Sequence, residues 1–221
     1  MLVTFTNRHG GVSQGDYSSL NLGDHVGDIA ADVLRNRSEL TALHGPVQFM
    51  NQVHGNRVAV IEEVTEVAPT ADALVTGIPG ITLAVMVADC IPLLLTSTQA
   101  VAAVHVGRRG LVNNVALRTI EVMREMGAQE ISAIIGPAIC GRCYEVSAEI
   151  HQEVVSNFPT ADSRTHSGSL ALDLPKALST VLQSAGISID ASQCVCTVED
   201  ADLFSYRRDA VTGRQAGLVR L

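Results

Sequence analysis

The stretch ITLAVMVADCIPLLL, residues 81–95, is the most apolar part of this 221-residue chain. Residues 81–87 are apolar or β-branched at consecutive positions, which is typical of a strand covered on both faces. Asp89, Cys90 and Pro92 then interrupt the run. It therefore stays shorter than the roughly 18 apolar residues of a membrane span. We expect this strand to lie in the core, with the polar residues at its end.

Short β-rich runs alternate with helical patterns along the rest of the chain. The further strands are predicted at Val47–Met50, Arg57–Ile61, Val101–His105 and Ile131–Ile135. The helical patterns run from Val112 to Met126, over Glu145–Asn157, and onward from Asp173, an N-cap residue followed by Pro175. This alternation predicts an α/β fold in which helices pack on a mixed sheet. No linker or repeat divides the chain, so residues 1–221 are expected to form one domain. The order of the strands in the sheet cannot be read from the sequence.

The composition restricts the class of protein. Hydrophobic residues make up 47% of the chain and charged residues 17%, which excludes a disordered protein. The formal net charge of -8 argues against general nucleic-acid binding, which needs a dense cationic face, although a few arginines could still hold a phosphate. The first residues, MLVTFTNRHGG, lack the charged start and apolar core of a signal peptide. The odd number of five cysteines favours reduced thiols, and we expect a cytoplasmic protein without a membrane anchor.

Three residues that can ligate a metal stand at the ends of predicted strands. His54 lies in the turn before a strand, Cys90 follows the strand 81–87, and His105 ends the run VAAVH. Open α/β sheets gather their ligands at such strand ends. Two imidazoles and one thiolate form a zinc set with an open fourth position, and copper would also accept these ligands. The same atoms allow a second interpretation without metal, in which Cys90 is a thiolate nucleophile and His105 its base.

A glycine- and arginine-containing loop follows His105. Its sequence, VGRRG at residues 106–110, leads into a helix expected from about Leu111. A strand, a glycine loop and a helix N-terminus together present free N–H groups, and Arg108 and Arg109 add charge-assisted donors, which suits a phosphate. A solvent-exposed basic turn is the alternative. The glycine pattern is neither GxGxxG nor a P-loop, so no nucleotide cofactor is indicated.

Two other segments allow more than one interpretation. Cys140 and Cys143 form a CxxC pair and Cys194 and Cys196 a CxC pair. Together they could supply the four thiolates of a zinc site, but the CxC spacing and the long gap favour unligated thiols in a reduced compartment. The arginine-rich residues 205–215 suit a hairpin, which either lies on the surface or frames a substrate pocket.

Motifs along most of the chain occur in an order that is specific to one family. They are Gly11–Ser13, Ser19–Gly23, His25–Asp28, Asn36–Arg37, Gln52–Gly55, Ala71–Ala73, Ala88–Cys90, Ala103–His105, Ile135–Pro137, Tyr144–Val146 and Phe204–Gly217. Through them the chain resembles the laccase-domain proteins, also called multicopper polyphenol oxidase-like or peptidoglycan editing factor proteins, which are regarded as zinc-dependent purine nucleoside phosphorylases. The resemblance implies a layered α/β sandwich with a mixed β-sheet. It also implies that His54, Cys90 and His105 are the metal ligands.

The resemblance implies phosphorolysis of adenosine, inosine, guanosine and methylthioadenosine, together with deamination of adenosine. For deamination, zinc would lower the pKa of a water, and Asp89 and Asp72 are the candidates for proton transfer by their position. For phosphorolysis, Arg37 and Arg109 are expected to hold the phosphate. We also expect substrate contacts from Asn51, Arg108 and Arg109, in a monomer or a small homo-oligomer.

One departure from the family bears on the substrate. Members usually read AVHAGWRG where this chain reads AVHVGRRG, so arginine stands in place of tryptophan at position 108. A guanidinium can also stack on a base but brings a charge. The metal ligands are unaffected, whereas the substrate preference and the catalytic competence depend on this change.

Three other functions remain open at this point. The first is a metal-independent cysteine hydrolase or amidase that edits a peptidoglycan precursor. The second is a laccase-like polyphenol oxidase that holds copper. The third is a metal- or nucleoside-binding module without catalysis, which the change at Arg108 would allow.

Overall fold

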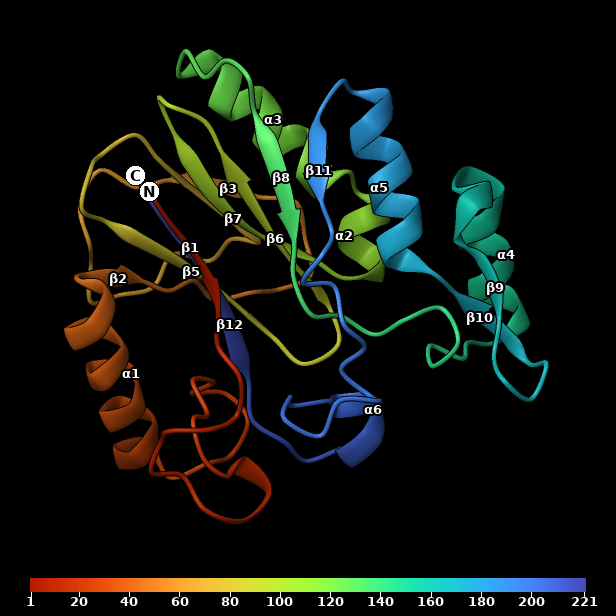
Figure 1. Ribbon diagram of the computed structural model, residues 1–221, viewed down its shortest axis with the longest axis horizontal. Helices are drawn as coiled ribbons and strands as arrows, with labels where there is room; N and C mark the ends of the chain where they lie inside the picture. Colours follow the sequence, from red (N-terminus) through yellow and green to blue (C-terminus); the bar gives the residue numbers. More distant parts are fainter.

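Two β-sheets lie face to face at the centre of the molecule, and helices cover both outer faces (Figure 1). The computed structural model describes residues 1–221. The larger sheet has the order β11 (Ser188–Asp190), β8 (Ser132–Ile135), β6 (Ile91–Thr96), β7 (Val101–Val106), β4 (Ala73–Thr76) and β3 (Val58–Val60). The smaller sheet has the order β1 (Leu2–Phe5), β12 (Gln215–Arg220), β5 (Thr82–Val87) and β2 (Val47–Gln48). A separate ribbon pairs β9 (Asp162–Arg164) with β10 (Leu170–Leu172).

Both large sheets are mixed, as predicted. In the six-stranded sheet β3 is parallel to β4 and β11 to β8, while β6 and β7 pair antiparallel. In the four-stranded sheet β12 runs antiparallel to β5, and β2 runs parallel to it. The fold is therefore the layered α/β sandwich expected from the sequence.

The helices form the outer layers. They are α1 (Ala30–His44), α2 (Arg108–Val112), α3 (Val115–Glu125), α4 (Ala148–Asn157), α5 (Leu174–Ser184) and the short α6 (Tyr206–Asp209), with 3₁₀ turns at Gly15–Tyr17 and Pro159–Ala161. Figure 1 shows α1 beside the smaller sheet and α3 and α5 beside the larger one. None of these helices combines the length and the apolar character that crossing a membrane requires.

The central strand β6 shows why residues 91–95 are apolar at consecutive positions. Leu93 and Leu95 belong to the core between the larger sheet and its helices, whereas Leu94 belongs to the core between the two sheets. Because successive side chains of a strand point to opposite faces, a strand with a packed layer on each side needs apolar residues at every position. The sequence predicted this character for the strand before Asp89, but β6 itself was not among the predicted strands.

The five predicted strands are present, with ends shifted by one or two residues, while the helices differ more at their starts. The pattern from Val112 to Met126 is divided between α2 and α3, because Asn114 has the left-handed φ of 56° and breaks the helix. Helix α4 begins only at Ala148, since Ser147 caps it and accepts a hydrogen bond from the Ile150 N–H. At α5 the prediction is confirmed: the Asp173 side chain accepts a hydrogen bond from the Lys176 N–H.

Helix α1 was not predicted, because its inner face is partly polar. The buried residues are Val33, Asn36 and Leu40. The Asn36 amide donates to the Ser13 hydroxyl and to the carbonyls of Ser19 and Asn21, so it anchors an N-terminal loop instead of joining the core. Leu40 packs on the smaller sheet, but with a polar residue between Val33 and Leu40 the buried face of α1 lacks the continuous apolar stripe from which helices are recognised in a sequence.

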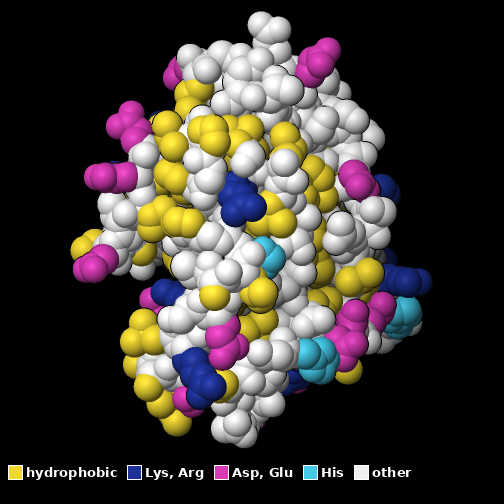
Figure 2. Space-filling view, turned by 60° about the vertical axis from the view of Figure 1, so that its left-hand side comes forward, with side chains coloured by type: hydrophobic (Ala, Val, Ile, Leu, Met, Phe, Trp, Pro, Cys, Tyr) yellow, Lys and Arg dark blue, Asp and Glu magenta, His cyan; other side chains and the backbone are white.

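On the face shown in Figure 2, arginine and lysine side chains are scattered among aspartates and glutamates and gather in no large patch. This distribution agrees with the formal net charge of -8.

Candidate metal centre

The structure brings together the three side chains His54, Cys90 and His105. Their ligand atoms all lie within 4.8 Å of one another. The Cys90 Sγ lies 3.9 Å from the His54 Nε2, and the two imidazole rings meet edge to face with centroids 4.6 Å apart. These residues are far apart in sequence, so their meeting is a property of the fold.

The pairing of β6 with β7 explains how two of the ligands meet. Pro92 on β6 lies opposite His105 on β7, so Cys90, just before β6, reaches the same sheet end. His54 comes from the turn that follows β2 and has a left-handed φ of 58°. Non-glycine residues adopt this conformation at a cost, and such strain is usual at functional sites.

Asp72 holds two of the ligands in place. Its carboxylate accepts hydrogen bonds from the N–H groups of Val53, His54 and Gly55, at 3.3, 2.9 and 2.7 Å, and lies 2.8 Å from the His105 Nδ1. Burial alone would raise the pKa of Asp72, but the hydrogen bonds from His105 and from the backbone lower it below its ordinary value. The carboxylate is therefore ionised, and the His105 Nδ1 carries the proton that it shares with Asp72.

The arrangement fits a tetrahedral metal ion. Zn–N distances of about 2.0–2.1 Å and Zn–S distances of about 2.3 Å place tetrahedral ligand atoms roughly 3.4–3.8 Å apart. With Nδ1 bonded to Asp72, the His105 Nε2 is free to ligate, which is the carboxylate–histidine–metal arrangement of many zinc sites. Three protein ligands leave a fourth position open. The residues present therefore fit a catalytic zinc ion, and copper remains compatible with the same donors.

Gly107 makes room for the cluster. A Cβ atom at this position would lie 2.9 Å from the Cys90 Sγ and 3.2 Å from the His54 Cδ2. Both distances are shorter than ordinary van der Waals contact, so any larger residue would push two of the ligands away. The glycine of the loop after β7 thus serves the cluster directly.

Without a metal ion, the thiol and imidazole of Cys90 and His105 form an ion pair. Burial opposes ionisation of the thiol, but the charge of His105 and hydrogen bonds from both histidines outweigh it and lower the pKa of Cys90 to about 6. Burial likewise opposes the charge on His105, yet the Cys90 thiolate and Asp72 raise its pKa to about 9. The same three residues are thus arranged as a thiolate, an imidazolium and an orienting carboxylate.

The cluster opens into a cavity of about 450 Å³. Besides the three ligands, its walls include His25, Gln52, Asp89, Tyr144, Tyr206, Arg207 and Arg214. Another hollow of about 470 Å³, beside Leu117 and Phe158, is lined by no titratable side chain. Of these two hollows, the one at the cluster therefore holds the groups for chemistry.

Asp89 stands in the cavity wall, and both of its carboxylate oxygens accept hydrogen bonds. The Thr197 and Ser205 hydroxyls donate to Oδ1 at 2.6 and 2.7 Å, and the Arg207 backbone N–H donates to Oδ2 at 2.6 Å. Its φ of 99° is left-handed and strained for a residue with a side chain. Asp89 thus ties the turn before Cys90 to the C-terminal segment.

Five of the expected site residues do not line the cavity. One is Asp72, described above, and the other four are Arg37, Arg108, Arg109 and Asn51. Arg37 donates to the Leu22 carbonyl and to Asp24, and its guanidinium lies over the Phe49 ring. Arg108 pairs with Glu153 at 3.2 Å, and Arg109 is exposed on α2. Asn51 is also exposed, with its amide on the Ala68 carbonyl. The loop at 106–110 therefore contributes Gly107 to the cluster, while neither of its arginines lines the cavity, although Arg108 interacts with Tyr144 of the cavity wall.

The cavity instead takes its arginines from the C-terminal segment, which the sequence had placed either on the surface or around a pocket. Arg207 donates to the Glu145 carbonyl and lies 5.2 Å from the centre of the Tyr144 ring. Arg214 donates through one nitrogen to the carbonyls of Thr212 and Gly213. The signal for these residues in the sequence was the density of arginines in residues 205–215, whereas Gln52 was marked only by its place in the motif Gln52–Gly55 that contains His54.

Comparison with known proteins places the chain in a family. A family model described as multi-copper polyphenol oxidoreductase laccase matches residues 2–221. A protein of Corynebacterium glutamicum named purine nucleoside phosphorylase is 45% identical over 228 residues, which cover 98% of this chain and 93% of that protein. One of the same name from Pseudomonas aeruginosa is 37% identical over 224 residues, covering 98% and 91%.

Solved structures agree with these matches. The crystal structure of a Neisseria meningitidis protein superposes with a TM-score of 0.90 at 39% identity and covers 98% of this chain and 92% of that chain. That of a Geobacillus stearothermophilus protein, YlmD, gives a TM-score of 0.86 at 31% identity and covers 99% and 91%. The chain therefore belongs to the family described as multi-copper polyphenol oxidoreductase laccase.

Proposed function

We propose that this protein is a zinc-dependent purine nucleoside phosphorylase that also deaminates adenosine. Its substrates would be adenosine, inosine, guanosine and methylthioadenosine, cleaved with phosphate to the free base and a ribose 1-phosphate. Relatives that are 37–45% identical bear the name purine nucleoside phosphorylase. The observation that carries the proposal is a three-ligand cluster opening into a cavity whose walls hold two tyrosines and two arginines. A volume of about 450 Å³ is in the range of small-molecule sites.

In this proposal the two cavity arginines bind the phosphate. Phosphorolysis joins a phosphate oxygen to C1′ of the ribose and breaks the bond from C1′ to the purine nitrogen. Arg207 and Arg214 would neutralise the phosphate and hold it against the sugar, since guanidinium groups donate charge-assisted hydrogen bonds to its oxygens. They take the role first expected of Arg37 and Arg109, because these two do not line the cavity.

The aromatic walls suit the purine. Tyr144 is half-buried and fixed beneath the Arg207 guanidinium, whereas Tyr206 is 59% exposed at the mouth of the cavity. Flat faces of this kind stack on a base with little dependence on its substituents. This arrangement is consistent with a site that accepts several purines.

Zinc held by His54, Cys90 and His105 would supply a Lewis acid with one open position. Asp72 would act by orienting His105 and the turn of His54, because all of its hydrogen bonds go to that turn and to that ring. Asp89 would position Arg207 by accepting its backbone N–H. Both aspartates are thus proposed as positioning residues rather than as the groups that transfer protons.

The test combines elemental analysis with turnover. Purified protein is incubated with each nucleoside and phosphate, and the bases and sugar phosphates are separated by chromatography. His105→Ala should lose the zinc ion of this centre and both activities. His151→Ala, which removes a histidine that pairs with Asp162 outside the cavity, should keep them. Full activity in a His105→Ala protein that has lost the zinc of this centre would contradict the proposal.

A cysteine hydrolase is the second candidate, favoured by the lowered pKa of Cys90 beside His105 and Asp72. Such an enzyme would cut an amide through a thiolate nucleophile and keep its activity when the metal is stripped. Chelation separates the two: a zinc enzyme loses turnover with a chelator and regains it with zinc, whereas a thiol enzyme is stopped only by iodoacetamide. Copper found instead of zinc, with oxidation of phenols, would favour a laccase-like reaction.

A further inference from the structure

A second cluster of metal-ligating side chains lies outside the proposed catalytic centre. The residues are Cys140, Cys143, Cys196 and Glu199, which we call the Cys140 cluster. Their sulfur and carboxylate oxygen atoms all lie within 4.8 Å of one another. The Glu199 Oε1 lies 3.4 Å from the Cys143 Sγ and 4.0 Å from the Cys140 Sγ. Nothing in the proposed reaction uses these groups.

The spacing of the ligand atoms suits a closed tetrahedral site. Zn–S distances of about 2.3 Å and Zn–O distances of about 2.0–2.2 Å place sulfur and oxygen ligands roughly 3.6 Å apart. The two distances from Glu199 lie on either side of this value. Three thiolates and one carboxylate complete four-coordination without a free position, which distinguishes a structural ion from a catalytic one.

The backbone around the thiols is already in place. The N–H groups of Cys143 and Tyr144 both donate to the Cys140 carbonyl, which closes the CxxC turn. The Cys140 N–H lies 3.5 Å from the Cys196 Sγ and donates to it, a bond that would orient a ligating thiolate. Ala138 forms an isolated parallel bridge with Cys196, so the two segments are held side by side before any ion binds.

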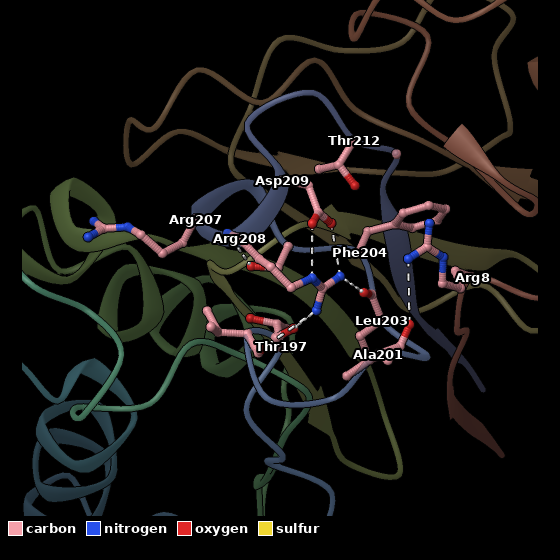
Figure 3. A network of polar contacts seen from close by, with 12 residues as sticks. Arg8, Thr197, Ala201, Leu203, Phe204, Arg207, Arg208, Asp209 and Thr212 are labelled. Atoms are coloured by element: carbon pink, nitrogen blue, oxygen red, sulfur yellow. Dashed lines mark hydrogen bonds and ion pairs between the residues drawn. The ribbon is translucent and has the colours of Figure 1, made fainter. Parts of the chain in front are cut away.

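The loop that carries Glu199 is held by an arginine. Figure 3 shows the Arg208 guanidinium within this loop, while Arg207 points away from the network. Arg208 donates to the carbonyls of Thr197, Asp200 and Leu203 and pairs with Asp209 at 2.9 Å. These bonds fix the segment on both sides of Glu199. The fourth ligand therefore needs little reorganisation to reach an ion.

We propose that Cys140, Cys143, Cys196 and Glu199 bind a second zinc ion with a structural role. The site differs from the four-thiolate arrangement considered from the sequence, because Cys194 packs against the hydrophobic core and Glu199 stands in its place. In an extended strand the two side chains of a CxC pair would share one face. Here Cys194 ends a turn in which its N–H donates to the Ala191 carbonyl, so it does not share a face with Cys196, and only Cys196 reaches the cluster.

The position of this site gives it a role in the shape of the cavity. Ile139 and Tyr144, which line the cavity, are adjacent to Cys140 and Cys143 in the sequence. Thr197, adjacent to Cys196, donates its hydroxyl to Asp89. An ion bound by the Cys140 cluster would therefore tie together two segments that carry or support the wall of the cavity. Hydrogen exchange in residues 138–146 and 194–200 should be slower with zinc than after its removal.

The test counts zinc per chain in protein purified under reducing conditions. The wild type should hold two zinc equivalents. The double variant Cys140→Ser/Cys143→Ser should hold one, and so should His105→Ala, while the control Cys194→Ser should hold two. Cobalt substitution adds an independent readout, because thiolate-to-cobalt absorption should fall by more than half in the double variant, which leaves Cys90 as the only ligating thiolate.

Three results would overturn the second site, two from zinc content and one from the state of the thiols. One is an unchanged zinc content in the double variant; another is a wild type whose only zinc disappears in His105→Ala. A disulfide between Cys140 and Cys143 in zinc-replete protein, found by mass spectrometry, would also refute it. If the double variant fails to fold, His105→Ala still decides, because it must retain one zinc. A wild type with one zinc that survives His105→Ala would instead count against the proposed catalytic centre and leave the second site standing.

Discussion

Replacing Asp72 by asparagine tests how the candidate metal centre is held together. The carboxylate of Asp72 is fully buried and accepts four hydrogen bonds, three from the backbone around His54 and one from the His105 ring. An asparagine has the same shape but presents one oxygen and one N–H₂ group. In either orientation of the amide, its N–H₂ group faces an N–H group that donated to the Asp72 carboxylate.

Both orientations of the amide have a defined consequence. If the N–H₂ replaces Oδ2, the N–H groups of Val53 and Gly55 lose their acceptor. If it replaces Oδ1, the N–H of His54 is left unpaired, and the His105 Nδ1 must become an acceptor, which moves its proton to Nε2 and blocks that ligand atom. Each unpaired buried donor costs about 1–3 kcal/mol.

We expect Asp72→Asn to bind zinc about 10- to 100-fold more weakly, the usual effect of removing a partner of a metal-ligating histidine. By the factor of ten per 1.4 kcal/mol, this loss is about 1.4–2.8 kcal/mol. The assay is competition with a chelator of known affinity, and denaturant unfolding of the metal-free protein measures the cost to the fold.

The control is Asp28→Asn. Asp28 accepts from Ser13, Asn21 and the Ile29 backbone but does not contact the metal ligands. It should destabilise the protein without changing the affinity for zinc. A folded Asp72→Asn protein with wild-type affinity for zinc would show that Asp72 does not hold the ligands as we describe.

Three further perturbations probe the same cavity. Gly107→Ala should weaken zinc binding, because its Cβ would meet the Cys90 Sγ at 2.9 Å; unchanged metal affinity by chelator competition would contradict this. In metal-free protein, the rate at which iodoacetamide alkylates Cys90 should fall below about pH 6, where the thiolate gains a proton, and should stay constant above it. Bound zinc should protect the thiol from alkylation. A midpoint of the pH profile at the ordinary pKa of a cysteine would refute the ion pair with His105. Arg214→Ala should raise the KM for phosphate about 10-fold or more, as expected for the loss of a charged hydrogen bond worth about 1.5–3 kcal/mol. Arg109→Ala, on the exposed face of α2, should leave this KM unchanged. Equal effects of the two substitutions would show that Arg214 does not belong to the phosphate site.

Much of the fold could be read from local patterns. The strands around residues 81–87 and 101–105 were predicted because a strand between two packed layers must be apolar at every position. The cap of α5 at Asp173 was equally local, since one carboxylate satisfies a free N–H at the helix start. Helix α1 escaped prediction because Asn36 on its buried face bonds a distant loop, and such a partner leaves no periodic pattern.

The sequence also pointed to His54, Cys90 and His105, because each is a polar residue at the end of an apolar strand or in a turn beside one, and because the order of the surrounding motifs resembles one family. Tertiary structure decided which other residues join them. Arg108 and Arg109 are near His105 in the sequence, yet neither lines the cavity, while Arg207 and Arg214 arrive from the other end of the chain. Likewise Glu199, rather than Cys194, completes the Cys140 cluster. The physical reason is the same in each case. The patterns of strands and helices arise from residues that are neighbours in the chain. A site forms where the pairing of distant strands and the folding of loops bring side chains within a few ångströms of one another, and no local sequence pattern records that distance.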